Sequence, residues 1–228
     1  MKKLISLLLA LMMLLPAFAL ADDASITVTG SATITLPSDR AILTIGVRTS
    51  APAASAAAAQ NADSIAALLT ALETAGILPE DVSTAEYNIY PHYDYDGSGS
   101  SVLSGYQITN MLSVVIRDVT QIGAVLDAAI AVGANETYGI TFTSTQQAEA
   151  QDQALIAALA EAQRKAALMA EAAGMTLGSI TELVENNGGY AVYKNAMFDM
   201  AAEAAGSTTI LADGVDVTAS VTVTFEMK

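Results

Sequence analysis

The stretch Gly105–Phe142, GYQITNMLSVVIRDVTQIGAVLDAAIAVGANETYGITF, decides how this chain folds. Apolar side chains recur at every second position in its first part, at Tyr106, Ile108, Leu112, Val114 and Ile116. This alternation predicts a strand with one buried face. Tyr138, Ile140 and Phe142 alternate in the same way. We therefore expect a second strand that returns beside the first, with a helix between them covering one face of the sheet.

The helix between these strands has recognisable ends. Asp118 is a candidate N-cap, and Gln121 follows three residues later. The apolar residues then fall at helical spacing, at Ile122, Val125, Leu126, Ala129 and Ile130. Gly133 provides a left-handed exit from the helix. None of these side chains is chemically reactive, so this unit is structural.

The rest of the chain supplies more strands and two more helices. We expect strands at 26–36, 41–48, 82–93, 178–185 and 215–227, with Gly30 as a candidate bulge in the first of them. A helix should run from Pro52 to Gly76, with a buried stripe of Ile65, Leu68, Leu69 and Leu72. An Ala-rich helix should occupy 145–173, with a stripe of Leu155, Leu159, Ala162, Ala166, Met169 and Ala173. That helix packs either on the sheet or against a copy of itself.

This order of elements predicts an α+β fold. Without the first strand, the first two thirds read βαββαβ, an arrangement that forms an antiparallel sheet with two helices on one face. We expect a single domain at 22–228. The βαββαβ-like part lies at about 26–144, and the long Ala-rich third helix and the two C-terminal strands lie at about 145–228.

The first residues predict export. Lys2 and Lys3 precede an apolar run, and small residues follow Pro16, so residues 1–21 read as a signal peptide with cleavage before Asp22. A retained membrane anchor is the alternative, but no later stretch is apolar enough to span a bilayer. We expect a periplasmic, envelope or extracellular protein without an integral membrane span after cleavage.

Composition excludes several classes of function. The chain contains no Cys, which excludes disulfides, thiol catalysis and thiolate zinc sites. Its formal net charge of −15 opposes binding to nucleic acid and anionic lipid.

A search for chemistry finds few candidates. The single histidine, His92, has no G-x-S-x-G elbow to complete a catalytic triad, and one histidine cannot build a multi-histidine metal site. Asp94 and Asp96 resemble part of a calcium loop, but the ligands at its first and last positions are wrong. We therefore expect no catalytic residue, no metal and no cofactor. The candidate ligands that remain are His92, Tyr93, Asp94 and Asp96, near a Tyr- and Asp-rich hairpin at 87–106.

A long connection separates the last two strands. It spans some 30 residues, and its segment 190–206 contains Met197, Phe198 and Met200. Connections of this length are uncommon without a function. The apolar residues predict a self-association surface.

The whole series of segments resembles the SIMPL domain family, formerly a domain of unknown function. The matching residues include Ile26–Gly30, Asp39, Ala41, Asn61, Thr84, Tyr87, Ile89, Pro91, Tyr93, Gly105–Tyr106, Val115–Asp118, Leu126–Asp127, Gly133–Asn135, Ile140, Phe142, Ala162, Lys165–Ala166, Ala170, Gly174, Leu177–Gly178 and Ile180. The chain departs from the family where Asp213-Gly214 replaces a frequent Pro-Gly. The resemblance implies an α+β domain without established enzymatic activity, assembly into a homo-oligomer, and a link to oxidative-stress tolerance.

Two hypotheses follow. The first is a non-enzymatic, exported protein that assembles with itself and contributes to envelope or oxidative stress protection. The second is a module that binds a small ligand or a cation at the hairpin near 87–106.

Overall fold

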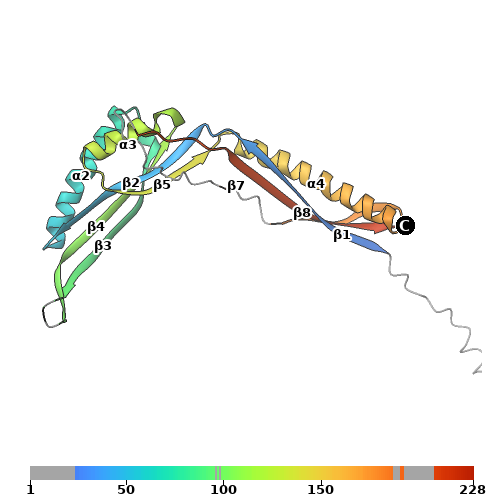
Figure 1. The fold of residues 1–228 in the computed structure, drawn as a ribbon, viewed down its shortest axis with the longest axis horizontal. Helices are drawn as coiled ribbons and strands as arrows, with labels where there is room; N and C mark the ends of the chain where they lie inside the picture. Colours follow the sequence, from blue (N-terminus) through green and yellow to red (C-terminus); the bar gives the residue numbers. More distant parts are fainter. Residues whose placement is uncertain (1–23, 96, 98, 187–190, 193–207) are drawn as a thin grey trace, which may run out of the picture.

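The protein consists of two antiparallel sheets joined end to end in a bent, elongated shape (Figure 1). This computed structural model describes residues 24–95, 97, 99–186, 191–192 and 208–228. The predicted signal segment 1–21, Asp96 and the trio Met197, Phe198 and Met200 lie outside these residues. Each sheet has four strands and carries its own helices, so we treat each as a module. The α+β fold class is confirmed.

The first module, here the two-helix module, is the predicted βαββαβ unit. Its strands are β2 (Arg40–Ala51), β3 (Val82–Tyr95), β4 (Ser101–Ile116) and β5 (Glu136–Thr143), and its helices are α2 (Ala54–Thr74) and α3 (Ile122–Ala131), with a short 3-10 turn at Pro79–Asp81. The strands lie in the order β3-β4-β2-β5, all antiparallel to their neighbours. The expectation that the strand after α3 returns beside β4 is wrong, because β2 lies between β4 and β5. In each βαβ half, a strand from the other half lies between the two strands, so the strands of the two halves alternate in the sheet. The apolar pattern within a single stretch of sequence cannot reveal this order.

A bulge in β5 breaks the predicted alternation. Gly139 pairs with Thr44 and Thr137 pairs with Ile45, so Tyr138 is an extra residue. Tyr138 consequently points to solvent rather than into the core, with 61% of its surface exposed. Gly139 has a φ of +119°, a conformation that favours glycine.

The ends of α3 follow the prediction in outline. Asp118 accepts hydrogen bonds from the backbone N–H of Thr120 at 3.0 Å and from Nε2 of Gln121 at 3.3 Å. The cap therefore exists, but it holds a 3-10 turn at Val119–Gln121 that precedes α3. The chain leaves the helix through Gly133 with a φ of +104°.

Large aliphatic side chains fill the core of the two-helix module. The biggest fully buried residues include Phe142, Leu43, Ile45, Leu68, Leu72, Ile116, Ile122 and Ile140. The predicted stripe of α2 is only partly right. Leu68 and Leu72 are buried and Ile65 packs beside them, whereas Leu69 is 42% exposed. Only part of the apolar surface of α2 therefore faces the sheet, and the buried stripe is narrower than the apolar pattern of the sequence suggests.

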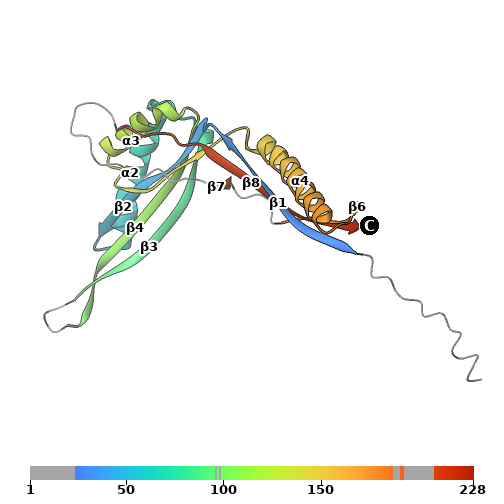
Figure 2. The same cartoon turned by 45° about the vertical axis from the view of Figure 1, so that its right-hand side comes forward.

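The second module, here the one-helix module, combines the two ends of the chain. Its strands are β1 (Ser25–Leu36), β6 (Leu177–Glu185), β7 (Ala191–Val192) and β8 (Val215–Met227), covered on one face by α4 (Gln147–Ala172). Strand β8 lies between β1 and β6 and also pairs with β7 (Figure 2). The N-terminal strand thus joins the C-terminal strands and not the βαββαβ sheet. The short strand β7 lies in the connection that was expected to be one long loop.

An unbroken row of alanines packs α4 onto this sheet. The buried residues are Ala150, Ala154, Ala158, Ala162, Ala166 and Ala170, four residues apart throughout. Leu155 and Leu159 of the predicted stripe are partly buried, but Met169 is 54% exposed and Ala173 is also exposed, so these two positions were wrong. The packing of α4 on the sheet agrees with one of the two alternatives left open by the sequence.

Gly30 is the point of closest approach between α4 and β1. The pairing of β1 with β8 runs without interruption through Gly30, so the predicted bulge is wrong. A Cβ atom on Gly30 would lie 2.0 Å from the carbonyl oxygen of Ala158 and 2.6 Å from the backbone nitrogen of Ala162. The glycine is there because the helix backbone occupies the space that a side chain would need.

Two aspartates tie the modules together where the chain crosses between them. Asp39 accepts hydrogen bonds from the backbone N–H of Thr145 at 3.0 Å and from its hydroxyl, joining the β1–β2 link to the start of α4. Asp127 of α3 accepts from the backbone N–H of Thr208 at 3.0 Å and from its hydroxyl at 2.6 Å, holding the segment that leads into β8. These threonine bonds hold the pKa of each aspartate below its usual value.

Candidate functional site

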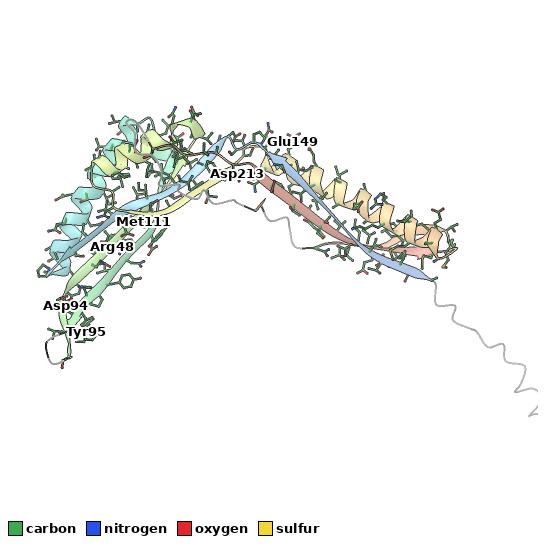
Figure 3. The ribbon with its side chains drawn as sticks, viewed as in Figure 1. Arg48, Asp94, Tyr95, Met111, Glu149 and Asp213 are labelled. Carbon is green, nitrogen blue, oxygen red and sulfur yellow. The ribbon has the colours of Figure 1, made fainter. Side chains whose placement is uncertain are left out.

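The hairpin formed by β3 and β4 extends beyond the rest of its sheet. Strand β2 pairs with β4 only as far as the pair Ala51 and Tyr106. Beyond that pair, His92–Tyr95 and Ser101–Gly105 are bonded only to each other. Figure 1 shows this two-stranded ribbon projecting away from the other module, and Figure 3 places Asp94 and Tyr95 near its end. We call residues 87–95 and 101–106, which comprise this ribbon and the part of the sheet edge that leads into it, the projecting hairpin.

Aromatic and aliphatic side chains cover the projecting hairpin. Those that are largely exposed are Tyr87, Ile89, Tyr90, Tyr93, Tyr95, Val102 and Leu103. Tyr87, Ile89, Tyr93 and Tyr95 alternate along β3 and therefore share one face. Leu103 pairs with Tyr93 on that face, so the two strands contribute to one surface.

This apolar face continues the core of the two-helix module into solvent. Ile89 pairs with Ile108, which is buried on the same side of β4 as Leu112 and Val114. Those inner residues are covered, but nothing among the described residues covers the outer ones. Tyr95 retains 80% of its surface exposure. An uncovered surface of this kind marks an interaction site more often than a catalytic one.

The structure brings two of the predicted ligands together. Nε2 of His92 lies 3.5 Å from Oδ1 of Asp94, and both side chains are largely exposed. Tyr93 lies between them in sequence and points to the opposite face of the strand. Among the described residues no group of three or more His, Cys, Asp or Glu side chains converges on one point. The pair is open to solvent and is not a preformed coordination site.

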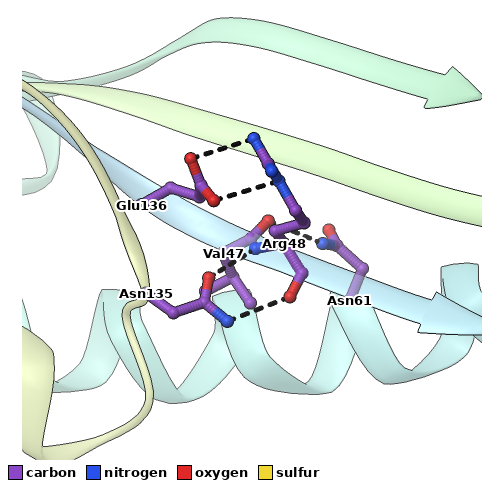
Figure 4. A network of polar contacts seen from close by, with 5 residues as sticks. All are labelled: Val47, Arg48, Asn61, Asn135 and Glu136. Atoms are coloured by element: carbon purple, nitrogen blue, oxygen red, sulfur yellow. Dashed lines mark hydrogen bonds and ion pairs between the residues drawn. The ribbon is translucent and has the colours of Figure 1, made fainter.

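A second polar cluster lies where β5 begins, and it has a structural role (Figure 4). Asn135 accepts a hydrogen bond from the backbone N–H of Arg48 at 2.7 Å and donates to the carbonyl of Arg48 at 3.0 Å. Its side-chain amide thus extends the pairing with β2 to the residue before the start of β5. The guanidinium of Arg48 binds Glu136 through two contacts of 3.0 and 3.1 Å. No group in this cluster is placed to attack a substrate.

Asn61 and Asn110 form a chain of amides beneath α2. Nδ2 of Asn61 donates to the carbonyl of Val47 at 3.1 Å, and Nδ2 of Asn110 donates to Oδ1 of Asn61 at 3.1 Å. Asn61 is almost fully buried, and these two hydrogen bonds satisfy its amide. They explain why a polar residue is tolerated on the buried face of an Ala-rich helix. The sequence offered Asn61 only as a position of family resemblance and did not indicate this partnership. The one signal in the sequence for this amide pair was Asn110 itself, because it interrupts the apolar alternation of β4.

Searches for related proteins agree with the resemblance found in the sequence. The 26 kDa periplasmic immunogenic protein of Brucella melitensis is 31% identical over 180 residues, which cover 75% of this chain and 72% of that protein. The uncharacterized protein YggE of Escherichia coli K12 is 30% identical over 161 residues, covering 71% of this chain and 65% of that protein. YggE of Edwardsiella ictaluri is 29% identical over 155 residues, covering 68% and 65%.

The names of these relatives bear on location and chemistry. The Brucella protein is described as periplasmic, which supports the exported, periplasmic localisation predicted from the first residues. None of these three relatives carries the name of an enzyme. Within the described part of the chain, no helix has the length and apolarity that a bilayer crossing requires. The sequence profile of the SIMPL family, described as a protein of unknown function (DUF541), matches residues 26–225, and this chain therefore belongs to the SIMPL family.

Proposed function

We propose that this protein is a non-enzymatic scaffold of the cell envelope that assembles with copies of itself through the projecting hairpin. The observation that carries the proposal is one exposed face that runs from Tyr87 and Ile89, on the edge strand of the sheet, to Tyr93, Tyr95 and Leu103, on the ribbon that extends beyond the sheet. Burying such side chains against a second copy is favourable, at roughly 25 cal/mol for each Å² of apolar surface removed from water.

The free edges of the ribbon support the same role. Strand β3 is an edge strand along its whole length, and β4 also has a free edge from Ser101 to Gly105. Unpaired strand edges pair readily with other chains. Pro91 lacks a backbone N–H, and the register shifts between Thr84 and Glu86, so both features interrupt the outer edge of β3. The geometry therefore favours contact through the apolar face over extension of the sheet.

Charge sets the expected salt dependence of the assembly. The chain carries a formal net charge of −15, so two copies repel each other at long range. Salt screens that repulsion and leaves an apolar contact intact. We expect self-association to strengthen between low and physiological ionic strength, which is the opposite of an assembly held by ion pairs.

Light scattering of the protein purified from the periplasm tests the proposal. The unaltered protein should be larger than a monomer at micromolar concentration. A double variant, Tyr93→Asp with Leu103→Asp, places two charges on the apolar face and should give the monomer mass. The matched control is Tyr138→Asp on β5, since Tyr138 is at least as exposed as Tyr93 and Leu103 but lies outside the hairpin. A monomeric unaltered protein, or an equal effect of the control, would contradict assembly through the hairpin.

A role in stress protection is a further part of the proposal, and it rests on the family resemblance. If assembly is required for it, the double hairpin variant should fail to restore peroxide survival to a strain that lacks the gene. The Tyr138→Asp control should restore it. Full rescue by a variant shown to be monomeric would separate the stress role from assembly.

The contact between His92 and Asp94 favours one second candidate, a weak cation or small-ligand site at the hairpin. Because imidazole and carboxylate together suit zinc better than calcium, zinc chloride should then raise the melting temperature of the unaltered protein and leave that of Asp94→Asn unchanged. An equal shift in both proteins would point to general screening of the acidic surface.

A further inference from the structure

A groove runs between α2 and the edge strand β3. Helix α2 packs mainly on β2 and β4 and makes few contacts with β3, so the inner face of that strand is left uncovered. The groove has a volume of about 460 Å³. Apolar residues make up more than half of its lining, including Ile65, Leu69, Ile77, Val82 and Leu112, and Thr70, Ser83 and Thr84 add hydroxyl groups. The volume is in the range of sites for small molecules and is too small for a folded partner.

Asn110 lines this groove and has a buried amide oxygen without a donor. Asn110 uses its Nδ2 to donate to Asn61, whose own Nδ2 donates to Val47. These bonds fix which end of the Asn110 amide is the oxygen. Oδ1 of Asn110 is buried and receives no hydrogen bond from any described residue. A buried acceptor left without a donor is costly, so a group that supplies the missing N–H or O–H gains from the contact.

Charge narrows the class of molecule further. Of the described residues that line the groove, Glu73 alone carries a charge. An acidic rim on a chain with a net charge of −15 repels anions. The apolar part of the lining disfavours strongly hydrated groups, and the hydroxyl groups of Thr70, Ser83 and Thr84 add no charge. The remaining class is a neutral, mostly apolar molecule with one hydrogen-bond donor.

We propose that the groove between α2 and β3 binds a small, neutral, apolar molecule whose single N–H or O–H group donates to Oδ1 of Asn110. This site is separate from the end of the projecting hairpin and does not require self-association. Leu69 is half exposed and lines the groove. Because Oδ1 of Asn110 is itself buried, the atoms that cover it must move before a ligand can reach it, so the site forms its final shape on binding.

Two ring compounds that differ in one donor provide the test. The probe is 2-naphthol, which has an O–H group, and its partner is 2-methoxynaphthalene, in which a methyl group replaces that hydrogen. Isothermal titration calorimetry would measure both affinities for the full chain. We expect 2-naphthol to bind about tenfold more tightly, the usual effect of one hydrogen bond to a buried acceptor. Equal affinities, or no binding of either compound, would overturn the proposal.

Variants locate the site. Leu69→Lys places a charge in the wall of the groove and should weaken both compounds at least tenfold. The matched control is Leu168→Lys, because Leu168 is also an exposed leucine of a helix but lies on α4. The control should bind both compounds as the unaltered protein does. Equal loss in both variants, or loss in neither, would place the binding elsewhere and overturn the assignment.

Asn110→Leu tests the acceptor itself. It should bring the affinity ratio of the two compounds close to one, while 2-methoxynaphthalene still binds. Retention of the tenfold ratio would show that the donor contacts a different atom. Because Asn110 also donates a hydrogen bond to Asn61, the affinities of this variant are compared only if its circular dichroism spectrum matches that of the unaltered protein. If the variant does not fold, the comparison of the two compounds on the unaltered protein still tests the proposal. Light scattering of the same samples separates a failure of binding from a failure of assembly.

Discussion

The two modules solve the same packing problem with side chains of different size. Each covers one face of a four-stranded antiparallel sheet with helix. The two-helix module fills the gap with Phe142, Leu43 and other large residues. The one-helix module brings α4 so close that alanines and Gly30 form the contact. The two-helix module is stabilised by large side chains that fill the space between helix and sheet, whereas the one-helix module requires small side chains so that helix and sheet can approach closely.

The largest expected effect comes from emptying the core of either module. Phe142→Ala should lower the free energy of unfolding by about 3–5 kcal/mol, because it removes a fully buried ring. Phe225→Ala is the counterpart in the one-helix module, where Phe225 is also buried. Urea unfolding followed by circular dichroism checks both. If the chain is a single cooperative unit, both variants shift one common transition. Separate transitions, each moved by one variant, would instead show two independent domains.

Adding volume to α4 should have the next largest effect. Ala158→Leu forces a larger side chain between α4 and the sheet, where Gly30 already leaves no room for a Cβ, and should cost about 1–3 kcal/mol. The control is Ala160→Leu, an exposed position two residues along the same helix. That change should stay within about 0.5 kcal/mol. Equal thermal stabilities of the two variants would show that the close packing of α4 is not a constraint.

Acid should weaken the ties between the modules. The pKa values of Asp39 and Asp127 are lowered from 3.8 in the folded protein by their bonds to Thr145 and Thr208. The ionised aspartates therefore stabilise the fold above that ordinary value, and the contribution is lost as pH falls through their folded values. Melting temperature should fall below about pH 4, and Asp127→Asn should show a shallower fall because it cannot titrate. An unchanged pH profile in that variant would contradict the tie.

The smallest effects are expected for exposed ion pairs. Arg164 holds the pKa of Glu161 at about 2 through a hydrogen bond, yet the pair is open to solvent on α4. Glu161→Gln should leave the melting temperature at neutral pH unchanged at physiological salt. Glu136→Gln removes the partner of Arg48 in the network of the two-helix module and should be the more harmful of the two. The reverse order would show that the exposed pair on α4 contributes more than the Arg48 network of the two-helix module.

Strands and helices were predictable because each is governed by local periodicity. The alternation of β4 and the helical spacing of α3 each depend on neighbours within a few residues. Both elements form over the expected residues, although β4 begins at Ser101, before the expected start of the strand. The same rules failed at Tyr138 and at Met169. Tyr138 is displaced by a bulge in pairing with β2, a strand almost one hundred residues earlier. Met169 is exposed because close contact with the sheet selects the alanine row and turns the neighbouring positions outward.

The sequence identified some residues of the candidate sites but not how these residues are arranged in space. The sequence singled out His92 and Asp94, and the structure places them in contact on an exposed strand. It did not indicate that the hairpin projects, because that depends on where β2 stops pairing with β4. The groove beside β3 was missed for a similar reason. Its existence depends on which strands α2 covers, and its acceptor depends on a bond between Asn61 and Asn110.

The sequence alone determined the α+β class, the order of the elements, the absence of cysteine chemistry and the resemblance to the SIMPL family. The first three follow from composition or from spacings of a few residues, whereas the resemblance depends on the order of short segments along the whole chain. Only the tertiary structure decided that β1 leaves the βαββαβ sheet to pair with β8, that Gly30 serves close packing, and that an aromatic face and an apolar groove lie open. Those features depend on contacts between residues far apart in the chain, where the free energy of burial selects one pairing among many that local propensity permits.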